Sequence, residues 1–280
     1  MDQLVEYFNQ MPSTHRTIIL VSGLAIFSVL EGINPFFKRN YQLGKHAITN
    51  IFFTLTTALV NFPLAFLIVL SSEWVVKNNF GIVQWLGGST LLFLTVGLLL
   101  MDLVGAWLVH YVEHHVKWMW KFHAVHHTDQ HVDTTSGNRH HPGESVFRLA
   151  FTILAVFLVG APIWLVFLYQ TISVIMTQFN HSNVSIPGWL DKSLGWLLVT
   201  PDIHRVHHHF RMPYSDNNYG NIFSIWDRIF NTFQTADNQN IRFGLDTHME
   251  EKYSNNVLAM LKMPFEKYRP KIKYENKERI

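Results

Sequence analysis

The sequence predicts an all-α protein, an integral membrane helical bundle that carries a cytoplasmic helical cap. Three observations support this fold class: long apolar segments, a shortage of charge and a concentration of histidine in the middle of the chain. Of the 280 residues, 48% are hydrophobic and 15% are charged, whereas charged residues make up about 25% of a typical soluble domain. The chain also has 17 histidines, and 14 of them lie between His110 and His209.

Four apolar segments are candidates for membrane helices. A spanning helix needs about 20 mostly apolar residues, and segments near 17–37, 51–70 and 83–109 meet this requirement. A fourth segment, 147–179, is interrupted by Gly160-Ala161-Pro162 and therefore predicts a tight helical hairpin. A soluble protein with buried helices is the alternative, but so many long apolar runs in one chain disfavour it.

The distribution of basic residues predicts how these segments cross the membrane. The loop after the first span contains Lys38, Arg39 and Lys45, whereas the loop after the second contains Lys77. Because cytoplasmic loops are enriched in Lys and Arg, we expect the N-terminus outside and the histidine-rich region in the cytoplasm. Residues 1–280 are then a single membrane domain, and residues 246–280 form a basic cytoplasmic tail. The membrane would be a bacterial inner membrane or the endoplasmic reticulum.

Three histidine motifs follow the third span, and a lone histidine follows the hairpin. The motifs are HYVEH at 110–114, HAVHH at 123–127 and HRVHH at 204–208. Spacings of three and four residues place side chains on one face of a helix. The rings that these segments bring together are His110, His114, His123, His126, His127, His181, His204, His207 and His208.

Nine clustered imidazoles indicate a metal site. A buried ring without a partner costs about 1–3 kcal/mol, and protonating neighbouring rings together sets like charges against each other. Metal binding removes both costs, and nine rings suffice for two ions with open positions, because one zinc ion takes at most four protein ligands. The chain has no cysteine, which excludes iron–sulfur clusters and thiolate sites. Neutral imidazole suits iron, zinc, copper or nickel, so the metal stays open at this point.

Several other polar residues are candidates for supporting roles. His141 is a candidate for a tenth ligand, and metal-bound imidazoles usually donate their second N–H to an acceptor. The candidates for that support are Asp102, Glu113, Glu144, Asp202, Asn218 and Asp227. We expect four histidines to support the site or face solvent, namely His115, His131, His140 and His209, and no role for His15, His46 and His248. Glu31, near one end of the first span, is expected to reach the membrane interface.

The motifs and their flanks resemble the fatty acid hydroxylase superfamily, also called the sterol desaturase family. HYVEH, HAVHH and HRVHH resemble its three histidine motifs, and WMWKFHAVHHTD, RHHPGE, NHSN and NNYGNIFSIWDRIFNTF resemble their surroundings. The resemblance covers about residues 95–245. It implies that the nine histidines hold two ferrous ions, and that the protein is a membrane-bound oxygenase using O2 to hydroxylate or desaturate an unactivated C–H bond of a lipid, such as a sterol or a fatty acyl chain.

The resemblance also predicts partners for this chemistry. The chain lacks a nucleotide-binding signature, so we expect electrons from a separate ferredoxin, cytochrome b5 or flavin reductase. The apolar spans are expected to form a channel that admits the tail of the lipid. The net charge of +2 is close to balance, so no nucleic-acid partner is expected.

Two other interpretations remain. HYVEH also fits the inverted zinc-protease pattern, with His110 and His114 on zinc and Glu113 as general base. This membrane protease would leave the two HxxHH clusters unexplained. The second alternative is a metal-binding membrane protein without catalysis, against which the completeness of all three motifs argues.

Overall fold

The computed structural model describes residues 1–272, so residues 273–280 of the predicted basic tail lie outside the described part. The described residues form helices and turns, and only three isolated β-bridges occur among them. Four helical segments are long and apolar enough to cross a membrane: Ser13–Ile33, Leu43–Trp85, Thr90–His115 and Ile163–Asn180. The predicted all-α membrane fold is therefore confirmed.

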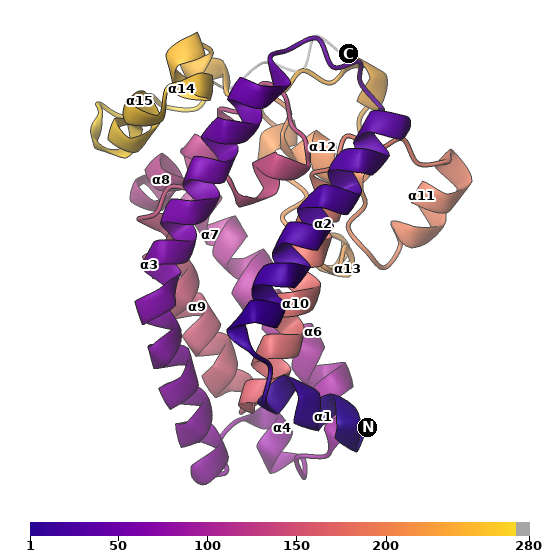
Figure 1. The fold of residues 1–280 in the computed structure, drawn as a ribbon, viewed down its shortest axis with the longest axis vertical. Coiled ribbons are helices and arrows are strands. Elements are labelled where there is room, and N and C mark those ends of the chain that lie inside the picture. Colours follow the sequence, from indigo (N-terminus) through magenta and orange to yellow (C-terminus); the bar gives the residue numbers. More distant parts are fainter. Residues whose placement is uncertain (273–280) are drawn as a thin grey trace.

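The N-terminal half begins with a short helix and continues with two long ones. Helix α1 spans Asp2–Asn9, α2 spans Ser13–Ile33 and α3 spans Leu43–Lys77. Helices α2 and α3 run along one side of the bundle and cross in front of α9 and α10 (Figure 1). Their outward side chains are strongly exposed, with Phe62 at 81% and Leu59 at 75%. Apolar side chains exposed on this scale fit a surface that faces lipid.

The third membrane segment starts later than the sequence suggests and is not a regular α-helix. Helix α4, Ile82–Trp85, is separated from it by Gly87 and Gly88, whose φ angles of 101° and 59° are left-handed. From Thr90 the helix continues to His115, through two π-helical stretches at Phe93–Gly97 and Leu103–Leu108. The intervening and final α-helical parts are α5 (Thr90–Leu92), α6 (Leu98–Asp102) and α7 (Val109–His115). Each π stretch alters which side chains face the bundle.

A hairpin of two helices packs in the centre of the bundle. Helix α9 spans Glu144–Val159 and α10 spans Ile163–Asn180. The turn between them uses Gly160, whose φ is +75°, and Pro162, which precedes α10. A side chain at Gly160 would collide with the Phe80 backbone, since an added Cβ would lie 2.3 Å from the Phe80 carbonyl oxygen.

The cap lies at the end of the bundle where α7 and α10 finish (Figure 1). Its longest helix, α8, spans Lys117–His127, and α12 spans Pro201–His207. The remaining α-helices of the cap and C-terminal region are α11 (Gly188–Leu194), α13 (Ile225–Ile229), α14 (Glu251–Asn255) and α15 (Val257–Lys262). Short 3-10 turns lie at Thr134–Asn138, Tyr214–Asp216, Asn238–Asn240, Asp246–His248 and Met263–Phe265.

Buried charge fastens the cap to the membrane helices. Glu31, at the end of α2, is 1% exposed and accepts hydrogen bonds from the backbone N–H groups of Thr134 and Asn183, each at 2.7 Å. Its other oxygen pairs with Arg39 at 2.6 Å. Glu31 was expected to extend to the membrane interface; the structure shows its carboxylate buried, where it satisfies backbone donors that would otherwise be buried without partners.

Candidate metal centre

The structure brings the nine predicted histidines into two adjacent groups of buried rings. Within each group, one nitrogen from every ring lies within 4.8 Å of the others. We call the nine rings together the histidine core. Group one consists of His110, His114, His123, His127 and His207, and group two consists of His126, His181, His204 and His208.

Four helical elements supply these rings. His110 and His114 are four residues apart on α7 and both enter group one. Helix α8 divides its rings, because His123 and His127 enter group one whereas His126 enters group two. The α12 region divides its rings in the opposite proportion, with His207 in group one and the other two in group two. His181 joins group two from the C-terminal end of α10.

Within each group the Nε2 atoms face one another at short range. The Nε2 atoms of His110 and His123 are 3.1 Å apart, and those of His114 and His127 are also 3.1 Å apart. In group two, His181 Nε2 is 3.0 Å from His204 Nε2 and 3.1 Å from His126 Nε2.

The opposite ring nitrogens determine which tautomer the rings adopt. His110 Nδ1 donates to the Tyr219 carbonyl oxygen at 2.8 Å, and His207 Nδ1 donates to the Asn217 carbonyl oxygen at 2.6 Å. His181 Nδ1 donates in the same way to a carbonyl, that of Thr177, at 2.8 Å. A neutral ring with its proton on Nδ1 carries an unprotonated lone pair on Nε2.

Two further rings of group one donate to carboxylates. His114 Nδ1 lies 2.9 Å from Asp216 Oδ1, and His123 Nδ1 lies 3.1 Å from Glu144 Oε1. The buried His207 Nε2 has no hydrogen-bond partner among the described residues. Lone pairs that converge at about 3 Å with no proton between them repel, and a cation among them turns this repulsion into coordination. The donor set therefore fits metal ions.

Burial keeps these rings neutral. Desolvation lowers the pKa of His123 to about 4, even though Glu144 opposes the shift, and lowers the pKa of His181 to about 3. The pKa values of the other core rings on α8 and α12 lie well below the usual range, first because of burial and then because of neighbouring histidines. Neutral imidazole is the form that binds a metal.

The predicted supporting residues divide into three kinds. Glu144 contacts the core directly through His123, whereas Glu113 lies 3.7 Å from the same ring and pairs with Arg148 at 2.8 Å. Asp227 supports the core indirectly. It accepts hydrogen bonds from the backbone N–H groups of Tyr219 and Gly220, each at 2.9 Å. These bonds position the loop whose carbonyl orients His110.

The other three candidates bond away from the rings. Asp102 accepts from the Trp226 indole at 3.0 Å, and Asp202 pairs with Arg205. Asn218 donates to the Ile203 and Gln234 carbonyls at 2.9 and 2.8 Å. They stabilise the loops around α12 and contact no ring of the core.

Sequence reasoning missed Asp216 and the three carbonyl acceptors. Asp216 follows the third histidine motif by eight residues, so an acid in that block was a visible signal. The acceptors of Thr177, Asn217 and Tyr219 are backbone atoms, which every residue carries, so no residue type marks them in advance.

The structure places His141 outside both groups. Its Nε2 lies 3.2 Å from the Leu261 carbonyl oxygen, and its Nδ1 accepts the Gly143 N–H at 3.0 Å. His140 is closer, since its ring stacks on His126 at 4.4 Å and its Nδ1 lies 3.0 Å from Glu144 Oε1. His115 and His131 are exposed, whereas His209 is buried and packs against Tyr214.

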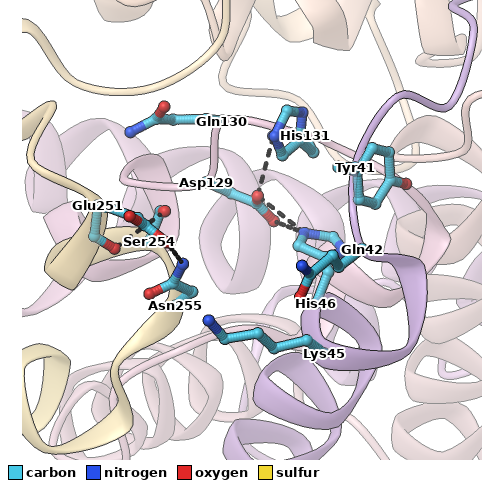
Figure 2. A pocket seen from close by; sticks show the side chains of 10 residues that line it. All are labelled: Tyr41, Gln42, Lys45, His46, Asp129, Gln130, His131, Glu251, Ser254 and Asn255. Carbon is cyan, nitrogen blue, oxygen red and sulfur yellow. Dashed lines mark hydrogen bonds and ion pairs between the residues drawn. The ribbon is translucent and has the colours of Figure 1, made fainter.

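His46 was expected to have no role, but it belongs to a buried cluster of opposite charges. Its Nε2 lies 2.9 Å from Asp129 Oδ1, and its Nδ1 lies 3.1 Å from Asp133 Oδ2. Arg139 lies 3.7 Å from Asp129. We call these four residues the Asp129 cluster. Figure 2 shows Asp129 bonded to both His46 and the His131 backbone at a polar cavity of about 310 Å³.

A small cavity of about 90 Å³ reaches the histidine core from inside the bundle. Its non-histidine lining includes Ser173, Thr177 and Asn221, together with Gly137 and Gly220. A Cβ added to Gly137 would lie 2.9 Å from the Thr177 side chain and 3.3 Å from His181 Nδ1. The glycine therefore allows close approach at the wall of the site.

Comparisons with known proteins agree with this geometry. Residues 94–232 match the fatty acid hydroxylase family. An ornithine lipid hydroxylase of Rhizobium tropici is 25% identical over 89% of this chain and 75% of its own length. Alkylglycerol monooxygenases of Caenorhabditis elegans and Homo sapiens are 32% and 30% identical, over 46% and 51% of this chain.

The match covers only 24% and 31% of those two monooxygenases. No solved structure is significantly similar. The matched region contains all nine rings of the histidine core, from His110 to His208. The relatives named above are lipid hydroxylases and monooxygenases. The chain belongs to the fatty acid hydroxylase superfamily.

Proposed function

We propose that this protein is a membrane-bound oxygenase that uses O2 and two iron ions to hydroxylate an unactivated C–H bond of a lipid. The observation that carries the proposal is that the neutral imidazole rings form two groups. In each group, Nε2 atoms converge at the end of the membrane helices. The lipid hydroxylase and monooxygenase names of the relatives support the same class of reaction.

Each residue of the site has a defined task in this proposal. The five rings of group one would hold one ion, and the four rings of group two would hold the other. The carbonyls of Tyr219, Asn217 and Thr177 keep protons on Nδ1, so that Nε2 stays available to a metal. Iron, when bound, supplies the activation of O2 and the oxidation of the C–H bond.

Several expectations from the sequence remain part of the proposal. The metal site and the C-terminus would be cytoplasmic and the N-terminus outside, in a bacterial inner membrane or the endoplasmic reticulum. A separate ferredoxin, cytochrome b5 or flavin reductase would deliver electrons. Desaturation is the second outcome of the same chemistry, because loss of a second hydrogen would replace the return of a hydroxyl group.

The geometry does not favour the zinc protease. A general base must approach the water that it activates, but Glu113 is fully buried and pairs with Arg148 at 2.8 Å. His110 and His114 share their group with three further rings, which leaves no role for those rings in a site with two histidine ligands.

Metal analysis of the purified protein tests the proposal. We expect about two irons per chain by elemental analysis, with a coupled signal in Mössbauer spectroscopy, and lipid-dependent O2 consumption in the presence of a reductant. The exposed His115 offers a matched control, and the His115→Ala variant should keep both irons. One zinc ion per chain without iron would support the zinc-protease interpretation instead. Two irons without O2 consumption would support a metal-binding protein without catalysis.

A further inference from the structure

A groove leads from the lipid-facing side of the bundle toward the histidine core. It has a volume of about 470 Å³ and lies between α2 and α3, with α9 and α10 at its base. Thr17 and Leu20 line it from α2, and Ala65 and Ile68 line it from α3. We call it the α2–α3 groove. The two helices at its mouth, α2 and α3, are candidate membrane spans, so the mouth faces the hydrocarbon of a bilayer.

The groove and the small cavity at the histidine core meet at two residues. His140 and Arg148 line both spaces. Glu144 lies between them, with its Oε1 atom 3.0 Å from His140 Nδ1 and 2.7 Å from Arg148 Nε. His140 also stacks on His126 of group two at 4.4 Å. A molecule in the groove would therefore reach the core by passing His140 and Arg148.

The inner end of the groove holds two buried polar atoms. Ser145 is 4% exposed and Glu144 is 0% exposed, and both line the groove. Ser145 Oγ and Glu144 Oε2 receive no hydrogen bond from an N–H or hydroxyl donor among the described residues, and the only side chain that shares a hydrogen bond with Glu144 on this side is the buried carboxyl of Glu113. A buried oxygen left in this state costs about 1–3 kcal/mol, so these two atoms point to a ligand that donates hydrogen bonds.

Two features determine the direction in which a lipid would lie. The histidine core sits where the spans end, since His114 closes the third span and His181 directly follows α10. This position corresponds to the level of lipid head groups, whereas the groove runs from there along the spans. A bilayer amphiphile places its polar head at the interface and its chain in the hydrocarbon.

We propose that the α2–α3 groove binds an amphiphile from the bilayer, with its chain between α2 and α3 and a hydrogen-bond-donating head, a hydroxyl or an ammonium group, at Glu144 and Ser145. The carbons that face the histidine core, between His140 and Arg148, are then those close to the head. The sequence led us to expect that the apolar spans admit the tail of the lipid, and this orientation adds that the head lies beside the histidine core. The binding proposal adds an orientation of the lipid to the proposed function. Only its statement about which carbons react rests on that function.

Photochemical cross-linking tests the proposal without any turnover. The probes are two forms of hexadecylamine, one with a diazirine beside the head and one with a diazirine at the far end of the chain. The protein is placed in phosphatidylcholine nanodiscs, and labelling is measured both without metal and after loading with iron. We expect the head probe to label residues 140–148 and the chain-end probe to label residues 13–20 and 61–68. Reversed labelling would overturn the orientation, and labelling only of outward faces would overturn the site.

Two matched variants sharpen the result. Ala65→Trp fills the groove and should abolish labelling of residues 140–148, whereas Leu59→Trp, on the outward face of the same helix, should leave it unchanged. Equal labelling in both variants would contradict the proposal. Iron content and O2 consumption are measured separately, so a protein without iron that labels as expected would overturn the proposed function alone.

The head group is tested by competition. Hexadecanol and hexadecylamine should displace the probe, whereas the methyl ether of hexadecanol, which has no donor, should compete about fivefold more weakly, as the loss of one hydrogen bond implies. Ser145→Val should reduce this preference for a donor. Equal competition by all three compounds would show that no hydrogen bond to Glu144 or Ser145 contributes to binding.

Discussion

The histidine core and the Asp129 cluster are both deeply buried and polar, but they satisfy their polar groups in opposite ways. In the Asp129 cluster each charged group contacts one of opposite sign: Asp129 lies 2.9 Å from His46 and 3.7 Å from Arg139. Arg139, which is 0% exposed, also donates to carbonyls of Tyr253 and Ser254. In the histidine core, chemically identical groups meet: the Nε2 atoms of neighbouring imidazole rings lie 3.0 to 3.2 Å apart.

The difference separates a structural cluster from a binding site. The Asp129 cluster is complete within the protein, because the positive charge of Arg139 offsets carboxylates that burial would otherwise penalise. The histidine core directs imidazole nitrogens of one kind toward its own centre, an arrangement that suits a bound cation. Changes to the core should alter metal binding, and changes to the cluster should alter stability.

The largest effect is expected from His126→Ala. The variant removes one of the four rings of group two, so we expect lipid-dependent O2 consumption to fall below detection and iron to fall from about two to about one per chain. Elemental analysis and an oxygen electrode measure the two quantities. Wild-type turnover in this variant would contradict the assignment of His126 as a ligand.

The next effect is a loss of stability of the metal-free protein in acid. The folded pKa of His123 is about 4 and that of His181 is about 3, whereas an unfolded histidine has a pKa of about 6.5. Between these values the unfolded chain binds more protons, so stability falls as the pH decreases, by about 1.4 kcal/mol per pH unit for each ring. Melting temperatures measured from neutral pH downward test this.

The Asp129 carboxyl should respond in a lower pH range. His46 and Arg139 outweigh the effect of burial and hold the pKa of Asp129 well below 3.8, so its contribution is lost only when the pH falls below about 3.8. Bound metal should shift the first transition to lower pH, because protons compete with the metal for the rings. A melting temperature that is constant from pH 7 to 4 without metal would contradict this account.

A third, smaller effect is expected from Asp129→Asn. The substitution leaves His46 and Arg139 without their shared counter-charge, so we expect a loss of about 3–5 kcal/mol in the free energy of unfolding. Iron per folded chain should stay unchanged. Unfolding in detergent followed by tryptophan fluorescence measures the loss, with Glu73→Gln at an exposed position as control. Loss of iron with unchanged stability would reverse the roles of the two clusters.

The smallest effect on the metal is expected from His141→Ala. This ring bonds the Leu261 carbonyl and the Gly143 N–H and contacts neither group of the core. We expect about two irons per chain and a loss of about 1–3 kcal/mol in stability from the two hydrogen bonds. A drop in iron content would make His141 the tenth ligand that its position before Pro142 suggested.

The sequence predicted the membrane segments well where hydropathy alone decides them and less well where backbone geometry does. The hairpin break at Gly160 and Pro162 was visible because both residues have specific backbone preferences. The third segment was expected from 83, but Gly87 and Gly88 take left-handed angles and the helix starts at Thr90. The glycine pair indicated a loosened start in the sequence, but apolar residues on both sides of it made the segment look continuous.

The roles of single polar residues were harder to predict. The sequence did not reveal the distant partners of Glu31 and His46. Glu31 accepts from the N–H of Thr134, 103 residues away, and His46 contacts Asp129, 83 residues away. Glu144 was a candidate among six acids and amides, and only the fold brings it to His123. Sequence spacing gives no information on contacts over such separations.

The sequence by itself determined which rings could act together, because spacings of three and four residues place them on one face of a helix whatever surrounds it. Only the tertiary structure decided how the nine rings divide. Rings four residues apart enter the same group, whereas the ring at a spacing of three enters the other group, so α8 and the α12 region each contribute to both groups. The packing of distant loops also supplies the carbonyls of Tyr219 and Asn217, which orient His110 and His207.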